Sequence, residues 1–296
     1  LYFLAPIVAF IAMYRVSKRF GLADFSSSIA GLIYAMSPVV WNSINDGRLG
    51  TLVLALVIPT FLSLNPHHIT PEINWRRIYG IALFAGFIGA FSPLLLSIWT
   101  LTFLIFLGID LFNRRSEIKD KKPLTFLMTA NLEIEKRKLA LGLLPIALNF
   151  PWSASFMLHP TQILLDPGLP LSGGSSISLA LFNPGGLSGV PFWIISPILI
   201  YLIAILFSNK FSKVGVISSA LLIIAIIFSP LHISGHGSIG KFWAGSLLIV
   251  IEALLIPRII ELGNDLIPNL RNSRLGLGHF VTAFIALLTI FSVAAT

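Results

Sequence analysis

The chain is a succession of apolar runs separated by short polar segments. Ten of these runs approach the roughly 20 mostly apolar residues that a helix needs to cross a bilayer. They are residues 1–14, 28–45, 50–64, 78–91, 93–112, 139–158, 191–208, 214–229, 242–257 and 279–296. The stretch 78–112 is too long for one span, and Ser92-Pro93 divides it because proline lacks the N–H that a continuing helix uses. The pattern predicts an all-α, polytopic bundle of about ten transmembrane helices.

The composition supports a lipid environment. Of the 296 residues, 56% are hydrophobic and only 11% are charged, whereas a soluble domain carries about 25% charged residues. We therefore expect the chain to lie in the cell membrane as a multi-pass protein. The excess of 20 Lys and Arg over 12 Asp and Glu is typical of cytoplasmic loops and does not require nucleic acid. The absence of cysteine excludes disulfides, thiolate catalysis and cysteine-based metal sites.

The basic residues sort to one side when the first span runs from outside to inside. Eighteen of the 20 then fall in cytoplasmic segments, as the positive-inside rule expects. They are Arg15, Lys18, Arg19, Arg76, Arg77, Arg114, Arg115, Lys119, Lys121, Lys122, Lys136, Arg137, Lys138, Lys210, Lys213, Arg258, Arg271 and Arg274. Only Arg48 and Lys241 remain outside.

Residues 1–296 are expected to form a single transmembrane domain. Its longest connections are a cytoplasmic loop, 113–138, and an outer loop, 159–190, which is rich in glycine, proline and serine. Because the chain begins and stops inside apolar runs, we also expect it to be a fragment of a longer polytopic protein.

The outer turn between the second and third runs concentrates polar chemistry. Asn45, Asp46 and Arg48 lie within four residues, together with Gly47. Arg48 would bind a phosphate through its planar donor fork, and Asp46 would act as a catalytic base or orient the substrate, with Asn45 beside them. Alternatively, Asn-Asp-Gly is simply a turn sequence and Arg48 lies among lipid head groups.

Further substrate-binding candidates lie elsewhere in the predicted bundle. Glu252 falls inside the ninth run, where a carboxylate costs about 2.5–3.5 kcal/mol and usually has a function or a partner. It could bind substrate, couple a proton, stay protonated, or reach the inner interface. Three further candidates lie on the outer face: His159, Asp166 and Lys241.

No motif assigns a cofactor or a metal. His232 and His236 have helical spacing but no acidic third ligand nearby, so we predict no metal site. Signatures of P-loop, dinucleotide-binding, serine-hydrolase and zinc-protease sites are absent. The six tryptophans lie mostly near predicted span ends, and we interpret them as an interfacial aromatic belt. They are Trp41, Trp75, Trp99, Trp152, Trp193 and Trp243.

Several stretches resemble multi-spanning bacterial glycosyltransferases. Tyr34-Ala-Met-Ser-Pro-Val-Val through Asp46-Gly-Arg-Leu-Gly to Pro59 resembles a paired-helix segment of that group. Similarity to its later outer loop is carried by Pro151-Trp152, His159-Pro160, Leu165-Asp-Pro-Gly-Leu-Pro170 and Phe182-Asn-Pro-Gly-Gly186. The chain thus resembles the membrane module of large actinobacterial family-2 glycosyltransferases, whose bundle looks like that of C-type (GT-C) transferases.

The resemblance implies synthesis of a cell-envelope polysaccharide, with a polyprenyl-phosphate-linked sugar or acceptor as partner. A cytosolic nucleotide-sugar domain would lie outside these residues. The catalytic acid of GT-C enzymes usually lies in the first outer loop, and neither that loop nor an Asp-x-Asp signature is recognisable here. No catalytic position is therefore carried over, and Asp46 and Arg48 are candidates only through the Gly-Arg-Leu-Gly match.

Two other classes of function stay open. The chain could be a secondary transporter or lipid-carrier flippase that uses Glu252 for coupling. It could also be a non-catalytic membrane anchor for a soluble enzyme.

Overall fold

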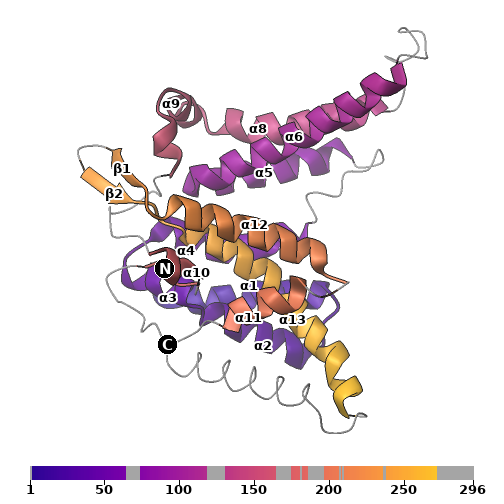
Figure 1. The fold of residues 1–296 in the computed structure, drawn as a ribbon, viewed down its shortest axis with the longest axis vertical. Helices are drawn as coiled ribbons and strands as arrows, with labels where there is room; N and C mark the ends of the chain where they lie inside the picture. Colours follow the sequence, from indigo (N-terminus) through magenta and orange to yellow (C-terminus); the bar gives the residue numbers. More distant parts are fainter. Residues whose placement is uncertain are drawn as a thin grey trace. The chain divides into compact units, whose positions relative to one another are not determined.

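A computed structural model describes residues 2–64, 74–118, 131–164, 175–180, 182–185, 197–206, 208, 210–235 and 238–271. These residues form twelve α-helices, two short 3-10 helices and one antiparallel β-hairpin (Figure 1). The fold is therefore all-α apart from the hairpin. The chain divides into two compact units, which we call unit 1 (residues 1–63 and 165–296) and unit 2 (residues 64–164).

The elements of unit 1 come from both ends of the chain. They are η1 (Tyr2–Leu4), α1 (Ala5–Arg19), α2 (Asp24–Ala35), α3 (Pro38–Asn45), α4 (Leu49–Ser63), α10 (Ser176–Ala180), α11 (Pro197–Leu206), α12 (Ser212–Phe228), β1 (His232–Gly235), β2 (Ser238–Lys241) and α13 (Gly245–Arg271). Those of unit 2 are α5 (Trp75–Phe91), α6 (Pro93–Ile118), α8 (Asn131–Leu148), α9 (Trp152–Leu158) and η2 (Pro160–Leu164).

The prediction of a ten-span, GT-C-like bundle is wrong. Within the described part of the chain, one helix segment, Pro93–Asp110 of α6, is long and apolar enough to cross a bilayer. The apolar helices α4 and α12 have 15 and 17 residues, fewer than the roughly 20 of a typical span. The run 279–296 lies outside the described residues.

Local breaks account for much of this difference. The run 28–45 becomes two helices, α2 and α3, because Ser37 caps a new helix that has Pro38 in its first turn. The run 139–158 is likewise divided between α8 and α9. The break predicted at Ser92-Pro93 is present, with α5 ending at Phe91 and α6 beginning at Pro93. Apolar runs read as single spans therefore contain helix ends.

Helix α13 forms the centre of unit 1. It packs against α2, α3, α4, α11 and α12. Leu247, Leu248, Ile249 and Ile251 are fully buried within one and a half turns of its N-terminal half. A helix that is apolar on every side is stable only when neighbours cover all of its faces, and this arrangement meets that need.

A side chain of α2 satisfies a backbone carbonyl that a proline leaves without a partner in α4. Pro59 lies inside that helix, and its missing N–H leaves the carbonyl of Ala55, four residues earlier, without its helical partner. The buried Tyr34 of α2 donates its hydroxyl to the Ala55 oxygen at 2.9 Å. The proline therefore ties α4 to α2 through a specific hydrogen bond.

Unit 2 also contains a helix in which a proline frees a carbonyl that a neighbouring helix then satisfies. Helix α8 packs against α5 and α6 and contains Pro145. The carbonyl that this proline leaves free belongs to Leu141, and Trp99 of α6 donates its indole N–H to that oxygen at 2.8 Å. At the end of α8, Asn149 Nδ2 donates to the Gly86 oxygen of α5 at 2.9 Å.

The predicted cytoplasmic loop 113–138 is helical at both of its ends. Helix α6 continues to Ile118 and α8 begins at Asn131, while residues 119–130 lie outside the described part. Charge does not stop a helix, since Arg, Lys and Glu are all good helix formers. The predicted outer loop 159–190 contains η2 and α10.

Candidate functional site

The turn between α3 and α4 directs two charged side chains into unit 1. Asp46 N–H donates to the Asn42 oxygen at 2.9 Å and Arg48 N–H to the Ser43 oxygen at 2.8 Å. Gly47 has a φ of 65°, a left-handed conformation that favours glycine. The chain thereby reverses within three residues. Asp46 and Arg48 are 4% and 3% exposed.

Arg48 lies over the indole ring of Trp243. Its guanidinium carbon is 4.3 Å from the ring centroid, well within the range of a cation–π interaction. Trp243 is 2% exposed, and its Nε1 donates to Thr51 Oγ1 at 2.8 Å. The ring is therefore held in place by α4, the same helix that follows the Arg48 turn.

Gly245 makes the position of this ring possible. A Cβ at residue 245 would overlap Trp243 Nε1 and would lie 3.0 Å from Thr51 Cγ2. Only a residue without a side chain lets the start of α13 approach the indole so closely. Gly245 is therefore part of the structure that holds Trp243 under Arg48.

A third segment binds the same face of α3. Asn42 lies one helical turn before Asp46, and its Nδ2 donates to Asn183 Oδ1 at 2.9 Å and to the Gly185 oxygen at 3.1 Å. The Gly185 N–H in turn donates to Asn183 Oδ1 at 3.0 Å. We call this set, Asn42, Asn183 and Gly185, the asparagine clamp. It joins segments that are 141 residues apart.

The turn and its surroundings bring together groups that suit a phosphorylated sugar. They offer a planar cation, a carboxylate and side-chain amides in a largely buried region. Buried charges are costly unless they are paired or hydrogen-bonded, so a turn holding Asp46 and Arg48 in the core requires either compensation or a function. An arginine is suited to oxyanions because its fork donates two parallel hydrogen bonds.

Glu252 forms a separate polar region in the core of unit 1. It is fully buried, and neither carboxyl oxygen has a hydrogen-bond partner of ordinary geometry among the described residues. The Ser37 hydroxyl approaches it, and Tyr34 is close enough to respond to its charge. Glu252 lies nine residues after Trp243 in the chain, on the helix that begins beside that ring.

Among the other predicted site residues, the structure describes the side chains of Asn45 and His159. Asn45 is exposed, on the outer side of the turn. His159 is exposed and belongs to unit 2. Lys241 ends β2, and its side chain, like the whole of Asp166, lies outside what the structure describes.

The sequence interpretation missed Trp243 as a site residue. Trp243 was assigned to an interfacial belt, but it is buried beneath Arg48. Trp99, assigned to the same belt, donates to the Leu141 carbonyl that Pro145 leaves free in α8. No local sequence pattern reveals that Trp243 packs beside the Arg48 turn, since 192 residues separate Trp243 from its hydrogen-bond partner Thr51. The Asn183-Pro-Gly motif was recognised as a turn and as part of the resemblance, but its contact with Asn42 was not predicted.

Neither a cluster of metal ligands among the described residues nor a similar known protein identifies the function of this site. The described residues contain no group of three or more acidic, histidine or cysteine side chains placed to hold a metal. No protein-family model, curated protein or solved structure matches the chain. The resemblance to glycosyltransferase membrane modules therefore stays a prediction.

Proposed function

We propose that this chain is a membrane-bound module of a glycosyltransferase that acts in cell-envelope polysaccharide synthesis. The turn 46–48 would bind the phosphate of a polyprenyl-phosphate-linked sugar or acceptor. The observation that carries the proposal is the buried Arg48, 4.3 Å above Trp243 and two residues from the buried Asp46.

Apolar surface supports a location in the membrane. Several helices expose large hydrophobic side chains in stripes with helical spacing, an arrangement that water disfavours and lipid accommodates. On α5 the stripe is Tyr79, Leu83 and Phe87; on α6 it is Leu101, Ile105 and Ile109; and on α12 it is Val216, Ile223 and Ile227. Helix α6 also contains the segment Pro93–Asp110, which is long enough to cross a bilayer.

The proposed reaction is an inverting displacement at the sugar's anomeric carbon. The acceptor hydroxyl oxygen forms the new bond to that carbon while Asp46 takes the hydroxyl proton. The bond from carbon to the lipid phosphate oxygen breaks, and its electron pair leaves with the phosphate. Arg48 stabilises the negative charge that develops on the departing phosphate. Such electrostatic stabilisation often contributes more to the rate of an enzyme than any other single effect.

Substrate access requires an opening of the site. Because Asp46 and Arg48 are nearly fully buried, we propose that a substrate reaches them when the asparagine clamp releases α3. The chain has no cysteine, so an Asn42→Cys/Asn183→Cys double variant tests this directly. Oxidation to a disulfide should abolish lipid binding and reduction should restore it. Equal binding in both states would contradict the opening.

Direct binding tests the site itself. The chain is reconstituted in phosphatidylcholine vesicles and titrated with radiolabelled decaprenyl phosphate. Arg48→Ala should weaken binding about tenfold or more, because a hydrogen bond to a charged group contributes about 1.5–3 kcal/mol. Arg48→Lys should give an intermediate affinity, since lysine keeps the charge but loses the planar fork.

Arg15→Ala provides the matched control, because Arg15 is an exposed arginine of the same unit. Its affinity should equal that of the wild type. Near-ultraviolet circular dichroism checks that the Arg48 variants keep their tertiary structure. Unchanged affinity in a folded Arg48→Ala protein would refute the site and favour a non-catalytic membrane anchor.

Glu252 supports a second candidate, a proton-coupled transporter or lipid-carrier flippase. Glu252 is fully buried, and the cost of desolvating a charge favours the neutral form of a buried carboxyl group, as a proton carrier requires. The test is transbilayer movement of fluorescently labelled polyprenyl phosphate in vesicles with a pH gradient. Glu252→Gln should abolish any gradient-driven movement. If the wild type shows no dependence on the gradient, this candidate is rejected.

A further inference from the structure

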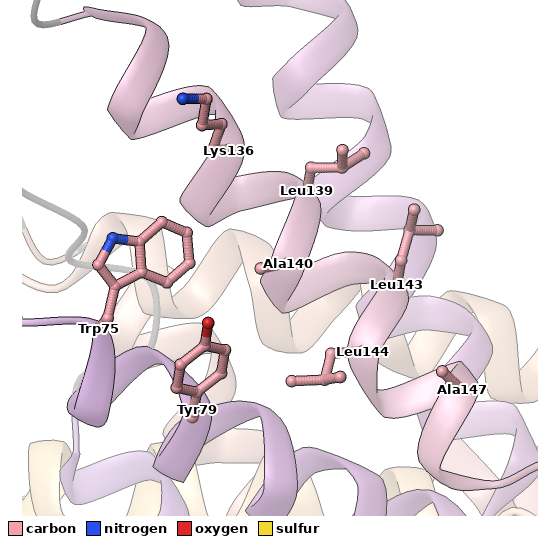
Figure 2. A pocket seen from close by; sticks show the side chains of 8 residues that line it. All are labelled: Trp75, Tyr79, Lys136, Leu139, Ala140, Leu143, Leu144 and Ala147. Atoms are coloured by element: carbon pink, nitrogen blue, oxygen red, sulfur yellow. The ribbon is translucent and has the colours of Figure 1, made fainter.

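Unit 2 contains an open groove between α5 and α8, with a volume of about 430 Å³ (Figure 2). Its lining is mostly apolar and includes Trp75, Tyr79, Leu139, Leu143 and Leu144. Lys136 contributes the one charged side chain of the lining. The volume lies in the range of small-molecule and cofactor sites, and neither the proposed transferase site nor any candidate from the sequence uses it.

The groove is cationic at one end and apolar along the rest. Helices α5 and α8 run in the same direction, since Arg137 of α8 lies 5.6 Å from the Trp75 ring and Asn149 contacts Gly86 further along. The exposed Arg76 and Lys136 therefore lie near the same end of the helix pair. Glu135 is buried and does not line the groove.

The length of the groove matches half of a bilayer. The lining of α8 extends from Lys136 to Ala147 (Figure 2), and eleven residues at about 1.5 Å each span about 16 Å. Half of a hydrocarbon core about 30 Å thick is about 15 Å. A single lipid chain lying along α8 would thus reach from the cationic end to the middle of the membrane.

We propose that this groove binds one hydrocarbon chain of an anionic phospholipid, whose phosphate lies beside Lys136. A lipid fits better than a peptide, because the lining has too few polar groups to pair with a peptide backbone. The negative head group complements the charge of Lys136, which lines the groove, and Arg76 lies near the same end of the helix pair. This inference rests on the membrane location in the proposed function but not on the Arg48 site.

The experiment measures which lipid remains bound. The chain is reconstituted in vesicles of equal parts phosphatidylcholine and phosphatidylglycerol, extracted in mild detergent, and examined by native mass spectrometry. The wild type should retain one phosphatidylglycerol in preference to phosphatidylcholine. Lys136→Glu should reduce this retention by about fivefold or more, because a basic residue near an anionic lipid surface contributes about 1 kcal/mol. Leu143→Glu should abolish it by placing a charge where the chain lies.

Matched variants separate the groove from general effects. Lys213→Glu changes an exposed lysine of unit 1, and Leu158→Glu changes an exposed leucine of α9 in unit 2 that does not line the groove. Both should retain phosphatidylglycerol as the wild type does. Equal retention of the two lipids, or no effect of Lys136→Glu, would overturn the inference.

Membrane association is measured separately by flotation of the same vesicles. A chain that floats with the vesicles but shows no lipid preference overturns this inference alone. A chain that does not float with them refutes the membrane location and the groove inference together.

Discussion

Both units place a buried arginine over a tryptophan, but they bury the tryptophan to different depths. In unit 1, Arg48 lies 4.3 Å from the Trp243 ring, and both side chains are in the core. In unit 2, Arg137 lies 5.6 Å from the ring of Trp75, which is half-buried and lines an open groove. The same residue types thus build the inside of one unit and the edge of a binding surface in the other.

This difference predicts that the two cation–π pairs contribute unequally to stability. Such pairs contribute about 0.5–1 kcal/mol when exposed and about 2 kcal/mol or more when desolvated. The Trp243 indole is also fixed by Thr51 and Gly245, so its loss disturbs more than one contact. Trp75 lines the groove of unit 2, where a ligand can cover it.

Replacing the two tryptophans should give the largest contrast. Trp243→Ala should lower the free energy of unfolding by about 3–5 kcal/mol, as expected for truncation of a buried aromatic residue. Trp75→Ala should cost only about 1 kcal/mol, close to the centre of the distribution for point mutations. Denaturant unfolding in detergent micelles measures both. Equal losses would mean that the burial of Trp243 does not determine its contribution.

Two glycines sharpen the same contrast. Gly245→Ala should destabilise the protein by about 1–3 kcal/mol, the usual cost of overpacking, because the new Cβ meets Trp243 and Thr51. Gly80→Ala on α5 has no heavy atom within 4 Å of the new Cβ and should stabilise by about 0.5–1 kcal/mol through helix propensity. The measurement is again denaturant unfolding, and the same sign for both variants would contradict the close approach at Trp243.

The hydrogen bond to the carbonyl that Pro59 leaves free provides a third test. Tyr34→Phe removes the donor to the Ala55 oxygen, and leaving a buried acceptor unsatisfied costs about 1–3 kcal/mol. In a Pro59→Ala background, residue 59 regains an N–H for that oxygen, so Tyr34→Phe should cost much less. A double-mutant cycle from unfolding curves measures this coupling. Additive effects would show that Pro59 does not create the need for Tyr34.

The smallest effect is expected at an exposed ion pair. Lys18 lies 2.9 Å from Asp24 and Tyr14 donates to the same carboxylate, so the pKa of Asp24 is lowered below its ordinary value of 3.8, with the Lys18 contact as the first cause. A lowered carboxyl pKa stabilises the folded state above that ordinary value, and the stabilisation disappears as the pH falls toward the lowered pKa.

Unfolding curves of the wild type and Asp24→Asn between about pH 5 and pH 2 test this expectation. The wild type should lose slightly more stability than the variant as the pH falls, because only the wild type gains a proton at residue 24. The effect should be small, since the pair is exposed to solvent. Parallel pH profiles would show that the ion pair does not contribute.

Local features of the sequence were enough to predict several helix ends. Ser92-Pro93 breaks the longest apolar run, and the Asn-Asp-Gly segment makes a tight turn around Gly47. These features act over a few residues, through capping, proline sterics and the permissive backbone of glycine. The same local reasoning also selected Asp46, Arg48 and Glu252, since charges in apolar surroundings are unusual in any fold.

The tertiary structure decided how many runs could be spans and what surrounds each charge. An apolar run looks the same whether it crosses lipid in one piece or forms two shorter helices with different neighbours. In the run 28–45, α2 packs mainly against α1, and α3 packs mainly against α4. The Trp243 ring beneath Arg48 is 192 residues from the Thr51 that fixes it, and the asparagine clamp joins residues 141 apart. Contacts of that kind form only when the helices pack, because no local preference links residues so far apart along the chain.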